Sequence, residues 1–159
     1  MAFRSGDAGE RHFSARGLAA MLNGDILREI RTADSCLRHA TRLSREHYPV
    51  VASQIALCAA AAMANATALA AEVFALGAVP VVAGCRKVIA PSTSTSLLPS
   101  PAQLRVVMAH YRRRLHMAEK LGLLRLRDVF RQIVDSKERH LSQSGLIQEI
   151  GTVSRYSCS

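Results

Sequence analysis

The stretch that decides the fold is residues 49–80, PVVASQIALCAAAAMANATALAAEVFALGAVP. It opens with Pro49, a residue that suits the first turn of a helix because the missing N–H would have no partner there. No residue between Val50 and Ala71 carries a formal charge. Gly77 and Pro80 then end the pattern, since glycine closes helices and proline cannot continue one. The sequence therefore predicts one long helix from Pro49 to about Leu76.

An uncharged run of this length is also long enough to cross a bilayer, so a membrane span is the alternative interpretation. Half of the run is alanine, and four polar side chains within it would each need a hydrogen-bond partner in lipid; these are Ser53, Gln54, Asn65 and Thr67. Alanine-rich segments that contain several polar residues insert poorly into a bilayer. The first twenty residues also lack the apolar core of a secretion signal. We therefore favour a helix buried between other helices of a bundle or oligomer, in a cytoplasmic protein.

Composition points to a single all-α domain. The chain has 159 residues, of which 49% are apolar and only 4% aromatic. This length supports one core without disulfides or a structural metal, and scarce aromatics with abundant alanine, leucine and arginine favour packed helices over sheets. The four cysteines are far apart and form no CxxC pair, so we expect reduced thiols.

Three further helices are predicted over residues 17–46, 101–122 and 124–150, because apolar residues recur there three and four positions apart. The pattern leaves two choices open: Cys36 or Leu37 on the inner face of the first helix, and Val129 or Phe130 on that of the last. Residues 1–16 are expected to be a mobile arm, residues 17–151 the bundle, and residues 152–159 a tail.

A Pro-, Gly-, Ser- and Thr-rich stretch from Ala78 to Ser100 separates the two pairs of predicted helices. Compact domains rarely contain a structureless connection of about 20 residues. A connection that crosses the full length of a bundle is one reason to have it, because the second helix is roughly 40 Å long. Two antiparallel pairs joined by such a crossover give an up-down-down-up four-helix bundle.

Three ionisable residues fall on the inward faces of these helices: Glu29 in the first, and Lys137 and His140 in the last. Buried charges are rarely left unpaired. The plainer interpretation is that the helix phase drifts, so that one or more of them lie at a partly solvated rim. The alternative is a polar centre inside the bundle.

The chain resembles bacterioferritin and the wider ferritin-like family over roughly Leu22 to Gly151. The resemblance rests on short matches whose mutual spacing agrees with the family: Leu22-Asn23, Glu29 in the metal-ligand place of the first helix, Leu76-Gly77-Ala78-Val79-Pro80 closing the second, and His140 in the last, before Ile150-Gly151. It implies a ferritin-like bundle with a long crossover, a role related to iron storage, and an oligomer.

The resemblance also shows where this chain departs from the family's di-iron site. The Glu-x-x-His pair of the second helix corresponds to Ala62 and Asn65, or with a one-residue slip to Ala61 and Ala64; the bridging Glu of the third helix corresponds to Leu104 or Arg105; the last Glu corresponds to Lys137. Only Glu29 and His140 remain as family positions. Two iron ions need several carboxylates to neutralise and bridge them, so we expect no di-iron site and no ferroxidase activity. We expect instead a buried ion pair between Glu29 and Lys137, with His140 nearby.

Met63 occupies the place of the methionine through which bacterioferritin binds haem b between two subunits. Methionine in an alanine-rich helix is more often a gap filler, so no cofactor is the first expectation and haem b at Met63 the alternative. The formal net charge is +9, which attracts polyanions or acidic partners, but the sequence has no nucleic-acid motif.

Three functions remain from the sequence. The favoured one is a non-catalytic ferritin-like subunit with a structural or assembly role, in a homo-oligomer or beside an active, more acidic ferritin-type subunit. The second is a haem-binding bacterioferritin-like subunit that transfers electrons for iron release. The third is a basic ferritin-like module that binds DNA or an acidic protein complex.

Overall fold

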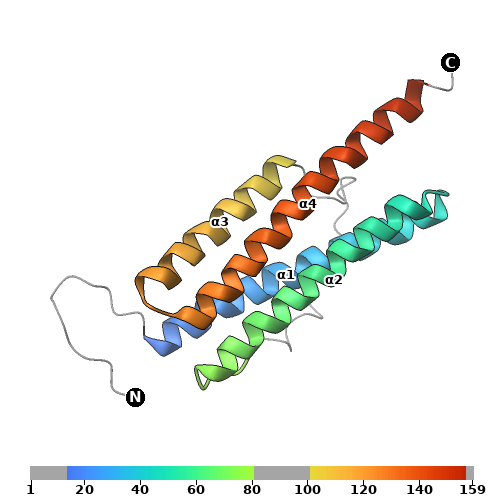
Figure 1. Ribbon diagram of the computed structural model, residues 1–159. Helices are drawn as coiled ribbons and strands as arrows, with labels where there is room; N and C mark the ends of the chain where they lie inside the picture. Colours follow the sequence, from blue (N-terminus) through green and yellow to red (C-terminus); the bar gives the residue numbers. More distant parts are fainter. Residues whose placement is uncertain (1–13, 81–100, 157–159) are drawn as a thin grey trace.

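The computed structural model describes the backbone of residues 14–80 and 101–156. It describes side chains and their burial for residues 14–80 and 101–142. These residues form four helices and no strand: α1 (Ala15–Arg45), α2 (Pro49–Ala75), α3 (Pro101–Lys120) and α4 (Leu124–Tyr156) (Figure 1). The predicted all-α four-helix architecture is therefore confirmed. Most of the predicted arm (residues 1–13) and most of the connection between α2 and α3 (residues 81–100) lie outside the described residues.

The helix ends follow from local chemistry. The Ser14 side chain accepts a hydrogen bond from the Gly17 amide and so caps α1. Gly77 and Gly122 follow α2 and α3 with φ of 73° and 66°, the left-handed conformation in which glycine has no Cβ penalty. The predicted end of the last helix, at about Ile150, is wrong: α4 continues through Gly151 to Tyr156, so residues 152–156 of the predicted tail are helical. A single glycine costs a helix only about 1 kcal/mol, which neighbouring residues can offset.

The helices form two antiparallel hairpins, α1–α2 and α3–α4, each closed by a three-residue turn. An ion pair between Arg125 and Glu72 places the start of α4 beside the end of α2. Further along α4, Lys137 reaches Glu29 of α1. Thus α1 and α4 run in one direction and α2 and α3 in the other (Figure 1).

The hydrophobic core has two parts. One is shared by all four helices and includes Leu22, Leu69, Tyr111 and Phe130. The other lies between α1 and α2 alone and consists mostly of small residues: Ala33, Cys36, Ala40, Ala52, Ile55, Ala59 and Ala62. The structure also decides the two choices that the sequence left open, because Cys36 and Phe130 are fully buried whereas Leu37 is exposed and Val129 is only partly buried.

The expectation that α2 is buried between other helices holds for only one of its faces. In its most apolar 18-residue window, 39% of the residues are buried, and Val50, Leu57, Met63 and Phe74 are exposed. By length and composition α2 is the one helix of the described residues that is apolar enough to cross a membrane. Its outer face is therefore an apolar surface without a partner in the described residues.

We predict that Leu126→Ala lowers the free energy of unfolding by about 2–5 kcal/mol, because Leu126 is buried in the shared core. Leu124→Ala, two residues earlier in the same helix, removes the same atoms from an exposed side chain and should cost less than about 0.5 kcal/mol. Urea unfolding of both variants measures the difference. Equal losses would contradict the assignment of the α4 inner face.

A closed polar centre as the candidate functional site

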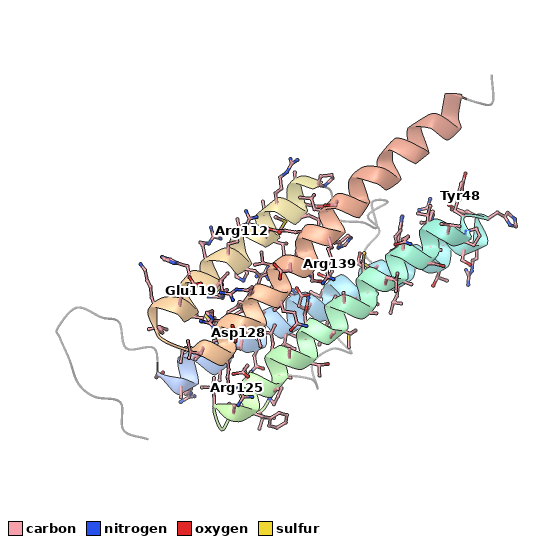
Figure 2. The ribbon with its side chains drawn as sticks, in the orientation of Figure 1. Tyr48, Arg112, Glu119, Arg125, Asp128 and Arg139 are labelled. Atoms are coloured by element: carbon pink, nitrogen blue, oxygen red, sulfur yellow. The ribbon has the colours of Figure 1, made fainter. Side chains whose placement is uncertain are left out.

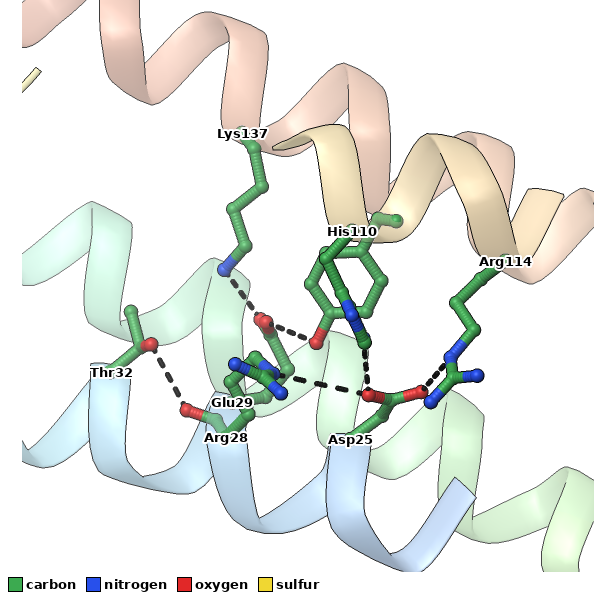
Figure 3. A network of polar contacts seen from close by, with 8 residues as sticks. Asp25, Arg28, Glu29, Thr32, His110, Arg114 and Lys137 are labelled. Atoms are coloured by element: carbon green, nitrogen blue, oxygen red, sulfur yellow. Dashed lines mark hydrogen bonds and ion pairs between the residues drawn. The ribbon is translucent and has the colours of Figure 1, made fainter. Parts of the chain in front are cut away.

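The carboxylate of Glu29 lies at the centre of the bundle, with its side chain fully buried. It accepts one hydrogen bond from each of the other three helices. From α2, Asn65 Nδ2 lies 3.0 Å from Oε2; from α3, Tyr111 Oη lies 2.9 Å from Oε1; from α4, Lys137 Nζ lies 2.6 Å from Oε2. The structure thus brings Glu29 and Lys137 together inside the bundle (Figure 3).

Helix periodicity places these groups. Glu29 lies on the same face of α1 as Leu22, Ile26 and Ala33, which are all buried. An isolated carboxylate in such surroundings would be costly, and hydrogen bonds with a countercharge offset that cost. Burial, then the charge of Glu29, raises the pKa of Tyr111 well above its ordinary value. The phenol therefore stays protonated at physiological pH and donates to the carboxylate.

His140 lies beside Lys137 on α4 and is also buried. Burial, then the charge of Lys137, lowers its pKa below the ordinary 6.5, and Glu29 opposes the shift. The imidazole is therefore neutral at physiological pH. Two thiols lie close by: burial raises the pKa of Cys36 to about 11 and raises that of Cys58, with Lys137 opposing. Both thiols stay protonated.

The positions that correspond to family metal ligands hold a different chemistry here. Asn65 uses its amide nitrogen as a donor to Glu29, and Ala62 belongs to the α1–α2 core. On α3, Leu104 is buried and Arg105 is exposed. Within residues 14–80 and 101–142, no group of three or more His, Cys, Asp or Glu side chains is arranged to hold a metal ion. Donors and apolar groups surround Glu29, where a metal site needs acceptors.

A second polar cluster, one helical turn from the first, was missed by the sequence analysis. Asp25 is 1% exposed and faces three basic side chains (Figure 3): His110 Nε2 at 2.7 Å, Arg114 Nε at 3.1 Å and Arg28 Nε at 3.9 Å. The available signal was spacing, because Asp25 precedes Glu29 by four residues and so shares its face of α1. This cluster links α1 to α3.

Met63 lies away from this centre. Its side chain is 46% exposed on the outer face of α2, so the structure does not bring it together with Glu29, Lys137 or His140.

The arginines of α3 and α4 lie mainly on the surface, and several of them face carboxylates (Figure 2). Arg112 contacts Glu138 at 2.7 Å, Arg131 contacts Glu119 at 3.9 Å, and Arg127 contacts Asp128 at 2.7 Å. Such exposed pairs contribute little stability. They do reduce the number of arginines that are available to phosphate groups of a nucleic acid.

The chain matches no family model and no curated protein. The class that the structure itself defines is an all-α four-helix bundle with a buried ion pair at its centre.

We predict that Lys137→Met lowers the free energy of unfolding by about 3–5 kcal/mol, because it leaves the Glu29 carboxylate buried without its countercharge. The double variant Glu29→Gln/Lys137→Met removes both charges at similar volume and should recover most of that loss. Urea unfolding of the single and double variants tests the coupling. A double variant that is no more stable than Lys137→Met would contradict it.

The lowered pKa of His140 predicts a loss of stability in acid. Because the unfolded chain binds this proton more readily, stability is fully present above pH 6.5, the ordinary histidine value, and falls as the pH drops below it. One such group contributes at most about 1.4 kcal/mol per pH unit. His39, whose pKa burial also lowers, adds to the same slope.

Urea unfolding between pH 7.5 and 5 measures that slope. His140→Gln should make it shallower, whereas His116→Gln, at an exposed histidine of α3, should leave it unchanged. An unchanged slope in His140→Gln would show that the pKa of His140 is the same in the folded and unfolded chain.

Proposed function

We propose that the chain is a non-catalytic ferritin-like subunit with a structural role in a cytoplasmic oligomer related to iron storage. One observation carries this proposal: the Glu29 carboxylate accepts hydrogen bonds from three side chains of the chain itself, Asn65, Tyr111 and Lys137. A ferritin-like bundle places its metal ligands on the inner faces of all four helices. The same four faces meet here around one carboxylate.

The helix directions support the ferritin-like part of the proposal. Helices α1 and α4 run in one direction and α2 and α3 in the other (Figure 1). In this arrangement a connection between α2 and α3 has to return along the length of the bundle, as in ferritin-like folds with one long crossover.

The charges at the centre support a non-catalytic role. Two iron ions bring at least four positive charges, which carboxylates must neutralise. The centre has one carboxylate, and Lys137 already neutralises it at 2.6 Å. A divalent cation would therefore meet an ammonium group and two hydrogen-bond donors before it could bind Glu29, so oxidation of iron at this place is disfavoured.

An exposed stripe on α2 supports assembly into an oligomer. Eight exposed residues recur at alternating spacings of three and four, which we call the outer stripe: Val50, Ser53, Leu57, Ala60, Ala64, Thr67, Ala71 and Phe74. This spacing is the one with which helices pack along a common seam. The stripe has no charge, and its small central residues would let a second helix approach closely.

The distribution of charge indicates which surface can meet a second copy. Residues 14–80 carry six Arg and five Asp or Glu, whereas residues 101–156 carry eleven Lys or Arg and five Asp or Glu. Two copies that meet through α1–α2 avoid the repulsion between their basic α3–α4 hairpins. Those hairpins remain accessible to a more acidic ferritin-type subunit.

Haem b binding is a second candidate, favoured by the position of Met63. Its exposed side chain neighbours Ala64 of the outer stripe, so a pair of α2 helices would bring two Met63 sulfurs toward one interface. A haem-carrying subunit of this kind would serve electron transfer for iron release.

We predict that native mass spectrometry after incubation with ferrous iron in the absence of oxygen detects a defined oligomer without tightly bound iron. We expect an oligomer because the outer stripe can pack against a second copy. We expect no bound iron because donors of the chain itself surround Glu29. Added haem b that shifts the mass by one group per two chains would favour the second candidate. A monomer at micromolar concentration, or two iron ions retained per chain, would contradict the proposal.

A matched pair of variants assigns the interface. Ala64→Glu places a charge in the outer stripe and should shift the oligomer toward monomer. Ala109→Glu makes the same change at an exposed alanine of α3 and should leave the mass unchanged.

A further inference from the structure

A pocket of about 180 Å³ lies between α2 and α4, beside the Glu29–Lys137 pair. Helix α2 contributes Leu57, Cys58 and Ala61, and α4 contributes Ser136, Lys137, Arg139 and His140. One water molecule needs only roughly 15 Å³ of such space. The pocket is therefore large enough for several waters or for a small solute, and polar groups line its α4 side.

Lys137 supplies the reason to expect an occupant. Its ammonium group has three N–H donors, and its side chain is 4% exposed. Among the described residues its one acceptor is Oε2 of Glu29. Buried donors are rarely left without a partner. Because Lys137 lines the pocket, an acceptor located there is placed to satisfy its remaining donors.

Lys137 brings a positive charge to the wall of the pocket. Burial raises the pKa of Cys58, and the charge of Lys137 opposes this shift. Burial also lowers the pKa of His140; Lys137 lowers it further, and Glu29 opposes with a smaller effect. Of the two charges in the ion pair, Lys137 therefore has the larger effect on His140.

Arg139 adds a second cation at the exposed edge. Two acidic residues, Asp135 and Glu138, line a neighbouring open hollow together with Arg139 and Ser142. Glu138 is engaged by Arg112 at 2.7 Å. Within residues 14–80 and 101–142, Arg139 itself forms no ion pair. Arg139 is thus available to a negatively charged solute, and the Lys137 ammonium keeps two N–H donors beyond its bond to Glu29.

We propose that this pocket binds a small oxyanion, held by the ammonium of Lys137, the hydroxyl of Ser136 and the guanidinium of Arg139. Charge-assisted hydrogen bonds of this kind are the strong ones in proteins. The group recognised is an anionic oxygen, which inorganic phosphate and a short carboxylate both offer. This site is independent of the proposed role in iron storage.

The test titrates the full chain with inorganic phosphate, and separately with acetate, at constant ionic strength, while NMR follows the imidazole signals of the histidines. We expect the His140 signals to shift and saturate while those of exposed His116 stay in place. The anion that saturates at the lower concentration identifies the source, phosphate or carboxylate. Absence of a saturable shift with both anions up to 50-fold excess over protein would overturn the proposal.

Two variants and one control separate a site from general charge. Arg139→Gln should weaken binding about 1.4- to fivefold, the range expected for one exposed charge. Arg131→Gln removes the same charge from an exposed residue of α4 that does not line the pocket and should leave binding unchanged. Equal weakening by both would overturn the proposal.

The double variant Glu29→Gln/Lys137→Met keeps the volume of the centre but removes the ammonium. Loss of saturable binding in this variant, with α-helical circular dichroism retained, supports the assignment to Lys137. Binding with unchanged affinity in the folded double variant would overturn it.

Discussion

The structure depends on the burial of one carboxylate, Glu29, at the point where four helices meet. Three donors from three different helices fix its position at 2.6 to 3.0 Å. A buried ion pair of this kind adds less stability than well-packed apolar residues would, because desolvation offsets its attraction. Its effect is geometric: a shift of any one helix along its axis would break a hydrogen bond inside the core.

The adjacent Asp25 cluster extends the same constraint to the α1–α3 contact. Asp25 is one turn from Glu29 and is held by His110 and Arg114. Two buried acidic groups on α1 are thus matched by basic and hydroxyl groups on α3 and α4. The α1–α2 contact is built differently, from alanines that allow close approach. Polar pairing therefore fixes the register between the hairpins, and small residues fix the distance within the first.

The same centre limits the chemistry that the bundle can perform. A metal ion needs lone pairs, and those of Glu29 are directed at an ammonium, an amide and a phenol. The neutral imidazole of His140 and the protonated thiols of Cys36 and Cys58 stand beside the positive charge of Lys137, which is paired with Glu29. These surroundings favour anions over cations, which is consistent with both the proposed structural role and the proposed oxyanion pocket.

Much of the fold could be predicted from the sequence, because Pro49, Gly77 and Gly122 mark helix ends and the apolar spacing marks inner faces. The inward positions of Glu29, Lys137 and His140 came from the same periodicity. The donors Asn65 and Tyr111 could not be paired with Glu29 in advance, since helix period gives a face but no rotation between hairpins. The exposure of the α2 outer face could not be predicted either. An uncharged helix has the same sequence pattern whether the helix that covers it belongs to the same chain or to another.

The most direct measurement is anomalous diffraction from crystals of the protein soaked in ferrous salt. The account predicts that Lys137 Nζ stays within hydrogen-bond distance of Glu29 and that no iron peak appears at that carboxylate. Two iron peaks a few ångströms apart beside Glu29, with Lys137 displaced, would contradict it.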